Sequence, residues 1–206
     1  MNGMVEDGIR NQNDWRKTMK ISQYKYFDNV LKNAEFTEEE CQVCSTEKNC
    51  LEGEYFDQGS EVISVCLECL DKGIITIDIP QFIKDRIYSN IEGNLVGKSK
   101  KEIEKLSNQL IEMLSKTPPV PWIQYNDWPV CCCDFARYLG EWNRGDINNN
   151  APNGDGKKYL MNILDDFTKS KVDDIDILWD NIGHYTAVFV FECIGCSKRI
   201  AVCQSY

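Results

Sequence analysis

The chain has 206 residues and a formal net charge of −10, with 42% hydrophobic and 27% charged residues. This length suffices for one well-packed domain with a small appended module, and no apolar run approaches the ~20 residues of a membrane span. The acidic charge disfavours nucleic acid and anionic lipid as partners and favours a basic protein; a surface that only maintains solubility is the alternative.

The N-terminal part of the chain is polar. Residues 1–18 are predicted to form a flexible leader that lacks the apolar core of a secretory signal, so a cytoplasmic location is expected. Residues 19–206 are predicted to form a single domain. Residues 21–27 alternate as a first strand does, and residues 37–40 have the composition of a helix start.

The 11 cysteines, in a chain without an export signal, favour metal ligation over a disulfide framework. Two Cys-x-x-Cys pairs occur early, at Cys41/Cys44 and Cys66/Cys69. Such pairs are typical of a site in which four thiolates bind one zinc ion. The sequence therefore predicts zinc at these cysteines, and a thiol-redox pair or four unligated core cysteines are the alternatives.

The residues around these pairs predict the fold of a zinc module within residues 37–80. Residues 54–56 and 62–65 are expected as short strands around a turn, and residues 66–72 as a short helix ended by Gly73. Residues three apart on a helix share a face, so the second cysteine pair can face one ion. A knuckle, a hairpin and a ligand-bearing helix follow one another as in a treble-clef zinc module.

The central part of the chain predicts helices and loops. Residues 98–116 carry apolar side chains at helical spacing and include Ser99, a residue type that caps helix N-termini. Residues 157–170 show a second such pattern. Residues 131–140 are expected as a short helix, and residues 146–156, rich in Asn, Gly and Asp, as a loop.

The C-terminal part predicts a β-hairpin. Residues 186–193 and 200–203 are strand-like, and the Cys193-Ile194-Gly195-Cys196 turn between them is half of a zinc ribbon. The predicted fold class is therefore α+β. It combines a treble-clef-like zinc module with a zinc-ribbon-like hairpin, packed with two or more amphipathic helices.

A second zinc site is predicted at Cys193 and Cys196 together with Cys132. The candidates for its fourth ligand are Cys131, Cys133, Asp134 and His184. Adjacent thiolates are not expected to reach one ion together. A hairpin of free thiols is the alternative, and a mixed ligand set with an open position would permit zinc catalysis.

Several different short motifs are distributed along the chain. They are Tyr24-Lys25-Tyr26-Phe27, the first cysteine pair, residues 66–73, Thr117-Pro118 before Trp122 and Trp128, Cys132-x-Asp134 before Leu139-Gly140, and residues 191–196. Together they resemble the CbrC family of small bacterial proteins, which is associated with colicin tolerance. The resemblance covers about residues 20–203. The family pattern has a further cysteine where this chain has Ala136.

The charge and the resemblance together imply a non-enzymatic, zinc-stabilised protein that confers tolerance or immunity to a bacteriocin. Its acidic surface would bind a protein partner such as a basic toxin domain. A zinc-dependent or thiol-redox enzyme and a structural scaffold are the alternatives. The sequence contains no nucleotide-binding glycine motif.

Overall fold

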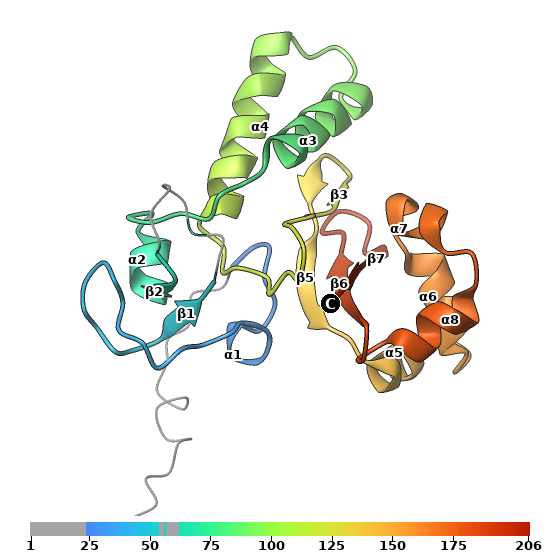
Figure 1. The fold of residues 1–206 in the computed structure, drawn as a ribbon. Helices are drawn as coiled ribbons and strands as arrows, with labels where there is room; N and C mark the ends of the chain where they lie inside the picture. The colour runs from blue at the N-terminus through green and yellow to red at the C-terminus, as the bar shows by residue number, and fades with distance from the viewer. Residues whose placement is uncertain (1–23, 54–55, 57–61) are drawn as a thin grey trace, which may run out of the picture.

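The computed structural model describes residues 24–53, 56 and 62–206, which form a mixed helical and sheet fold (Figure 1). The helices are α1 (Val30–Asn33), α2 (Leu67–Asp71), α3 (Gln81–Asn94), α4 (Lys100–Ser115), α5 (Arg144–Asn150), α6 (Gly156–Ile163), α7 (Asp166–Lys171) and α8 (Ile175–Asn181). The strands are β1 (Cys50–Glu52), β2 (Ser64–Cys66), β3 (Val130–Cys131), β4 (Asp134–Phe135), β5 (Arg137–Glu141), β6 (Thr186–Glu192) and β7 (Arg199–Ser205). The mixed class is confirmed, whereas the predicted leader at residues 1–18 lies outside the described residues.

A three-stranded antiparallel sheet, in the order β5-β6-β7, lies between two hydrophobic cores. All residues of β6 except the last are buried. Because successive side chains of a strand point to opposite faces, Phe189 and Phe191 enter the larger core and Val188 and Val190 the smaller one. The predicted C-terminal hairpin is confirmed as β6 and β7.

Different parts of the chain cover the two faces of this sheet (Figure 1). Residues of α5, α6 and α8 form the smaller core, and these helices lie to the right of the sheet. The larger core contains the cysteine-rich segment with β1, β2 and α2, and an aromatic group in which Trp122 stacks on Phe191 at 5.7 Å between ring centroids. The sheet therefore connects two separately packed halves.

Helices α3 and α4 form a hairpin that extends from the larger core at the top of Figure 1. The helix predicted at residues 98–116 is confirmed as α4, and Ser99 caps it in a reciprocal pair with Glu102. Helix α3 was not predicted, although it buries three isoleucines spaced four apart: Ile83, Ile87 and Ile91. No helix in the described parts of the chain is both long and apolar enough to cross a membrane.

The helix predicted at residues 131–140 is wrong. Strands β3 and β4 pair through a two-residue turn, Cys132-Cys133, and β5 follows directly. The φ angles of Cys132 and Cys133 are 52° and 63°, in the left-handed region that a right-handed helix excludes. Two consecutive residues with positive φ are typical of the tight turns that match the twist of a β-hairpin.

The helix predicted at residues 157–170 is also wrong as a single element. It is divided into α6 and α7 at Leu164, whose ψ of 138° is extended. Asp165 explains the break, because its N–H donates to the Ala201 carbonyl oxygen at 2.9 Å and its carboxylate caps α7. The loop predicted at residues 146–156 begins within α5, which Asn143 caps.

The cysteine-rich segment differs from its prediction in register. Strand β1 lies before the predicted first strand and pairs with β2 in the register Cys50 to Cys66. The predicted strand at 54–56 and turn at 57–60 fall largely outside the described residues. No helix begins at Thr37, whose N–H instead donates to the Cys50 carbonyl oxygen. Of the strand predicted at residues 21–27, residues 21–23 lie outside the described part, and Phe27 forms an isolated bridge with Tyr138.

Candidate metal centres

The first cysteine cluster joins a loop to a helix. Cys41 and Cys44 lie on the loop before β1, Cys66 ends β2, and Cys69 lies in α2. The four Sγ atoms all lie within 4.8 Å of one another. The predicted short helix is confirmed as α2, and Cys66, which is its N-cap, lies with Cys69 of the helix against the two cysteines of the loop.

The second cluster joins two β-turns. Cys131 and Cys132 come from β3 and its turn, and Cys193 and Cys196 from the tip of the β6–β7 hairpin. These four Sγ atoms also lie within 4.8 Å of one another. Close packing brings the turns together, since a Cβ added to Gly195 would lie 3.0 Å from the Cys132 Cβ.

The two clusters contain the same knuckle. In the first, Ser45 N–H donates to the Cys41 carbonyl oxygen at 2.8 Å, and in the second Ser197 N–H donates to that of Cys193 at 2.9 Å. Both serines adopt left-handed conformations, with φ of 56° and 58°. Each knuckle therefore repeats the sequence Cys-x-x-Cys-Ser in one backbone shape, and that recurrence is visible in the sequence.

The structure brings together all four cysteines predicted for the first site and all three predicted for the second. It places Cys131 as the fourth member of the second cluster, so the expectation that adjacent thiolates would not share a site is wrong in geometry. The left-handed Cys132 explains this result, because the turn directs both thiols to one side. Metal binding by these residues stays a prediction.

The other candidates for the fourth ligand have different surroundings. His184 is exposed and precedes β6, at the end of the strand opposite the hairpin tip. Asp134 accepts a hydrogen bond from the Tyr26 hydroxyl at 2.8 Å and pairs with Lys25 at 2.7 Å. Cys133 N–H donates to the Asn90 side-chain oxygen, which holds that residue toward α3.

The distances within the clusters fit a single metal ion. Sγ–Sγ distances are 3.6 Å for Cys44–Cys66, 3.7 Å for Cys131–Cys132 and 3.8 Å for Cys131–Cys196. A tetrahedron with metal–sulfur bonds of ~2.3 Å has edges of ~3.8 Å, whereas a disulfide bond is ~2.0 Å long. The described cysteines are all free thiols. Both clusters can therefore hold a metal ion.

The electrostatics of each cluster make one thiol more acidic than its neighbours. In the first, burial alone would raise the pKa of Cys41, but backbone N–H groups of Cys66 and Val43 lower it to about 7. Burial raises the pKa of Cys66 to about 11. In the second, the backbone N–H of Lys198 lowers the pKa of Cys196 to about 7. Binding of a cation would therefore displace protons from the remaining thiols.

The clusters differ in their exposure to solvent. In the first, Cys44 is exposed and the other three cysteines are buried. In the second, Cys132 and Cys196 are exposed, Cys131 is half-buried and Cys193 is buried. The first set of four thiols is thus mostly buried, whereas the second set is open to solvent.

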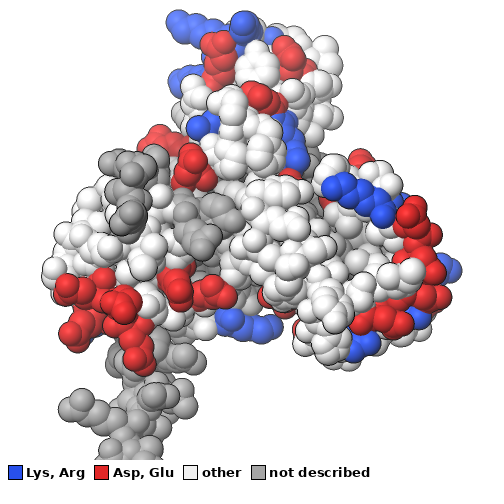
Figure 2. Space-filling view, viewed as in Figure 1, with Lys and Arg blue, Asp and Glu red and all other residues white. Residues whose placement is uncertain are grey.

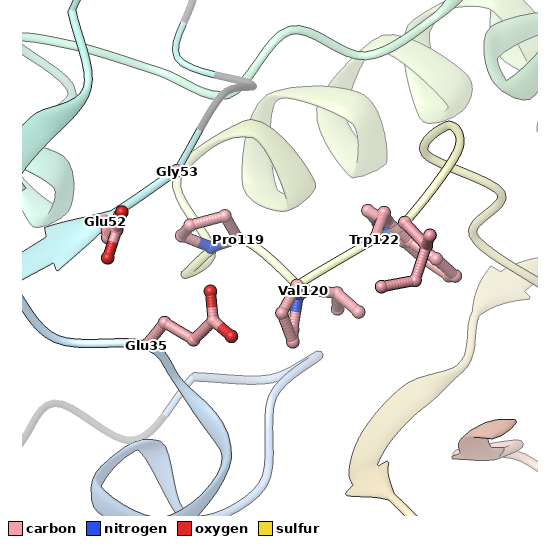
Figure 3. Close-up of a pocket in the computed structure, with 8 residues that line it drawn as sticks. Glu35, Glu52, Gly53, Pro119, Val120 and Trp122 are labelled. Atoms are coloured by element: carbon pink, nitrogen blue, oxygen red, sulfur yellow. The ribbon is translucent and has the colours of Figure 1, made fainter. Parts of the chain in front are cut away.

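A cavity of about 310 Å³ lies beside β1 (Figure 3). Glu35 and Glu52 lie on one side of it, and Pro119, Val120 and Trp122 form the opposite wall. Partial burial, and then the nearby Glu52 and Glu141, raise the pKa of Glu35. Sequence reasoning missed this cavity because its acidic and apolar walls are distant in the chain and share no motif.

A second cavity, of about 330 Å³, lies next to the second cluster. Cys131 and Lys198 are in its lining, together with residues of both cores. On its floor, Arg86 pairs with the buried Asp127 at 2.7 Å and donates to the Trp128 carbonyl oxygen. This cavity therefore adjoins both the metal candidate and the junction of the two halves.

The family model described as an uncharacterised protein family, UPF0167, matches residues 21–204. The chain belongs to this family. The match spans both cysteine clusters and both cores, so it covers the whole described fold except its last residues. No curated protein and no solved structure matches the chain. The narrower resemblance to the CbrC proteins stays a prediction.

Proposed function

We propose that this UPF0167 protein is a zinc-stabilised, non-enzymatic protein that binds a basic protein partner through its acidic surface. Two parts of the molecule support the proposal. The cysteine clusters support the zinc, and the helical face at α8 supports the binding. The exposed apolar side chain among carboxylates on α8 is the observation that carries the binding function.

Thiolate ligands and tetrahedral spacing favour zinc at both clusters. Each cluster has four cysteines, so an ion bound there has no position left for a substrate or a water molecule. Sites closed in this way are structural rather than catalytic. The knuckle, the β1–β2 pair and α2 support a treble-clef-like arrangement at the first site, and the β6–β7 tip supports a ribbon-like one at the second.

The short strands near each site explain why metal would be needed. Strands β1 and β2 have three residues each, and β3 and β4 have two each. Pairs this short are not stable in isolation. A metal ion that crosslinks the loop to α2, or the hairpin tip to the β3–β4 turn, would couple its binding free energy to the folding of these elements.

Figure 2 shows acidic side chains gathered in more than one area, and one of these areas, at the lower right, belongs to the helical half that contains α8. Its exposed carboxylates include Asp173, Asp174, Asp176 and Asp180. Ile177 lies among them on α8 with 63% of its surface exposed. Lys157 pairs with Asp176 beside it, and an exposed apolar side chain within such a charged rim is the arrangement of an interface anchor.

A partner of opposite charge fits this surface. The net charge of −10 would accelerate the encounter with a basic protein, and the carboxylates of α8 would orient it. A cationic nuclease-type toxin domain has this chemistry. Tolerance or immunity to a bacteriocin is the specific role that we propose for the complex.

Binding of purified cationic toxin nuclease domains to the zinc-loaded chain tests this proposal. We expect association that slows steeply as salt increases, and an affinity at least about tenfold weaker for an Asp173→Asn/Asp176→Asn/Asp180→Asn variant. The matched control is Glu47→Gln/Glu92→Gln/Glu104→Gln, which changes the net charge equally but lies elsewhere. Absence of binding together with absence of protection in a killing assay contradicts the proposal, as does an equal effect of both variants.

A further inference from the structure

The second cluster combines two properties that the first does not. Two of its thiols, Cys132 and Cys196, are exposed, and they come from different segments of the chain. The half-buried Cys131 lies near both of them, at Sγ–Sγ distances of 3.7 Å to Cys132 and 3.8 Å to Cys196. A small oxidant can therefore reach a thiolate that already has a second thiolate next to it.

We propose that the second cluster is a redox-responsive metal site. Hydrogen peroxide oxidises it to a disulfide between Cys196 and either Cys131 or Cys132, and the metal ion is released, while the first cluster retains its ion. This inference rests on the metal occupancy proposed above and adds a function to one of the two sites. Thiolate character and exposure are the properties that decide which cysteines are oxidised.

The chemistry is a two-electron exchange in two steps. The Cys196 thiolate attacks one peroxide oxygen, the O–O bond breaks, and a sulfenic acid and hydroxide form. The thiolate of Cys131 or Cys132 then attacks the sulfenic sulfur, the S–S bond forms and a second hydroxide leaves. Two solvent protons convert the hydroxides to water. The two thiolates lose two electrons, the peroxide gains them, and only two ligands remain for the metal.

The local backbone gives this reaction a structural consequence. Cys132 and Cys133 hold left-handed conformations in a turn that packs on Gly195 of the hairpin tip. Cys133 N–H donates to the Asn90 side-chain oxygen in α3 at 2.9 Å. Replacement of a four-thiolate ion by one disulfide would therefore alter the contact of the hairpin with the turn and, through Asn90, with α3.

The first cluster lacks the geometry for the same response. Its one exposed thiol, Cys44, lies 3.6 Å from Cys66, which is buried where β2 meets α2. Cys41 and Cys69 are buried as well. An oxidant therefore reaches only one thiol there, and each possible disulfide partner of that thiol is buried, so oxidation should be slow.

Metal release from the wild-type chain loaded with zinc at both sites tests the inference. Excess hydrogen peroxide is added, and free zinc is followed with a chromophoric chelator. We expect one equivalent to leave with a rate constant at least about tenfold greater than the other. Differential alkylation and peptide mass spectrometry should find a disulfide that joins the peptide of residues 130–135 to that of residues 192–198. Dithiothreitol and zinc should restore the original state.

Variants assign the fast phase to its site. Cys193→Ser, which removes a ligand from the second cluster, should abolish the fast phase, whereas Cys41→Ser should leave it. Release of both ions at one rate, earlier release from the first cluster, or a Cys193–Cys196 disulfide overturns the inference. The peptide mapping needs no variant, so misfolding of a mutant cannot decide the result. A chain that binds no zinc contradicts instead the metal occupancy proposed above.

Discussion

The two cysteine clusters start from the same knuckle and differ in what completes it. In the first, Cys66 caps α2 and Cys69 lies in that helix, and both are within the larger core. In the second, the adjacent Cys131 and Cys132 belong to a β-turn, and the cluster is open to solvent. The shared knuckle thus supplies two of the four thiols in each cluster. The element that supplies the other two determines how buried and how chemically stable the cluster is.

The largest effect should come from removal of a ligand at the first cluster. Cys69→Ser would leave three thiols, two of them buried, and uncouple α2 from the knuckle, because Cys69 is buried among core residues. We expect loss of one zinc per chain and a decrease in Tm of more than about 10 °C, which corresponds to several kcal/mol. Metal analysis and calorimetry measure both quantities.

Cys203→Ser is the control for that variant, since Cys203 is a cysteine outside both clusters. It should retain both zinc ions. If Cys69→Ser keeps its metal and its Tm, the first cluster is a group of core thiols and the comparison between the two sites loses its basis.

A smaller effect should distinguish neighbouring cysteines at the second cluster. Cys132→Ser should lose one zinc and lower Tm by about 3–6 °C, because the turn lies at the edge of the fold. Cys133→Ser should keep both zinc ions, although Cys133 has the same left-handed backbone and is the next residue. Equal loss of metal in both variants would show that the turn, and not the Cys132 thiol, is required.

The sequence predicts the first cluster more completely than the second for a physical reason. All four members of the first cluster belong to two Cys-x-x-Cys pairs, so spacing alone predicts them, although Cys66 caps α2 and does not lie within it. Cys131 joins its cluster only because Cys132 and Cys133 adopt positive φ, which is uncommon for residues other than glycine. The run of cysteines gives no turn signal, and the same residues were therefore predicted as a helix.

The prediction of helices and strands depends on the same distinction between local sequence patterns and contacts between distant segments. The β6–β7 hairpin and α4 have clear patterns of alternation and helical spacing, and both were predicted. The break between α6 and α7 depends on the hydrogen bond from Asp165 N–H to the Ala201 carbonyl oxygen. Contacts between distant segments of this kind override local propensity, and a single sequence does not reveal them.

Gly195→Ala should weaken the second cluster without removal of a ligand. The added Cβ would lie 3.0 Å from the Cys132 Cβ, so the hairpin tip and the turn must separate by a few tenths of an ångström. We expect a loss of stability of about 1 kcal/mol and a severalfold lower zinc affinity at that site. Competition with a chelator measures the affinity.

Gly93→Ala is the matched control for that substitution. Gly93 lies in the last turn of α3, and an added Cβ would meet no atom within 4 Å. Alanine there should stabilise the chain by about 0.5 kcal/mol because of its better helix propensity, with zinc affinity unchanged. A stabilising or neutral Gly195→Ala would mean that the contact between turn and hairpin does not position the second cluster.

The smallest effect is expected at Glu35, in the half of the molecule that contains the first cluster. It tests the electrostatics of that half and not its metal binding. Partial burial and the nearby Glu52 and Glu141 raise the pKa of Glu35, so its ionised form opposes folding. A raised pKa in the folded state means that the chain is relatively more stable below the unfolded pKa of ~4.3 and loses this advantage as pH rises through the folded value. Glu35→Gln should therefore raise Tm at pH 7 by less than about 2 °C, since solvent screens the partly exposed carboxylate, and by less still at pH 4. Calorimetry at the two pH values measures the difference, and Glu47→Gln is the control on the neighbouring loop. A decrease in Tm at pH 7 would instead mean that Glu35 makes a stabilising contact.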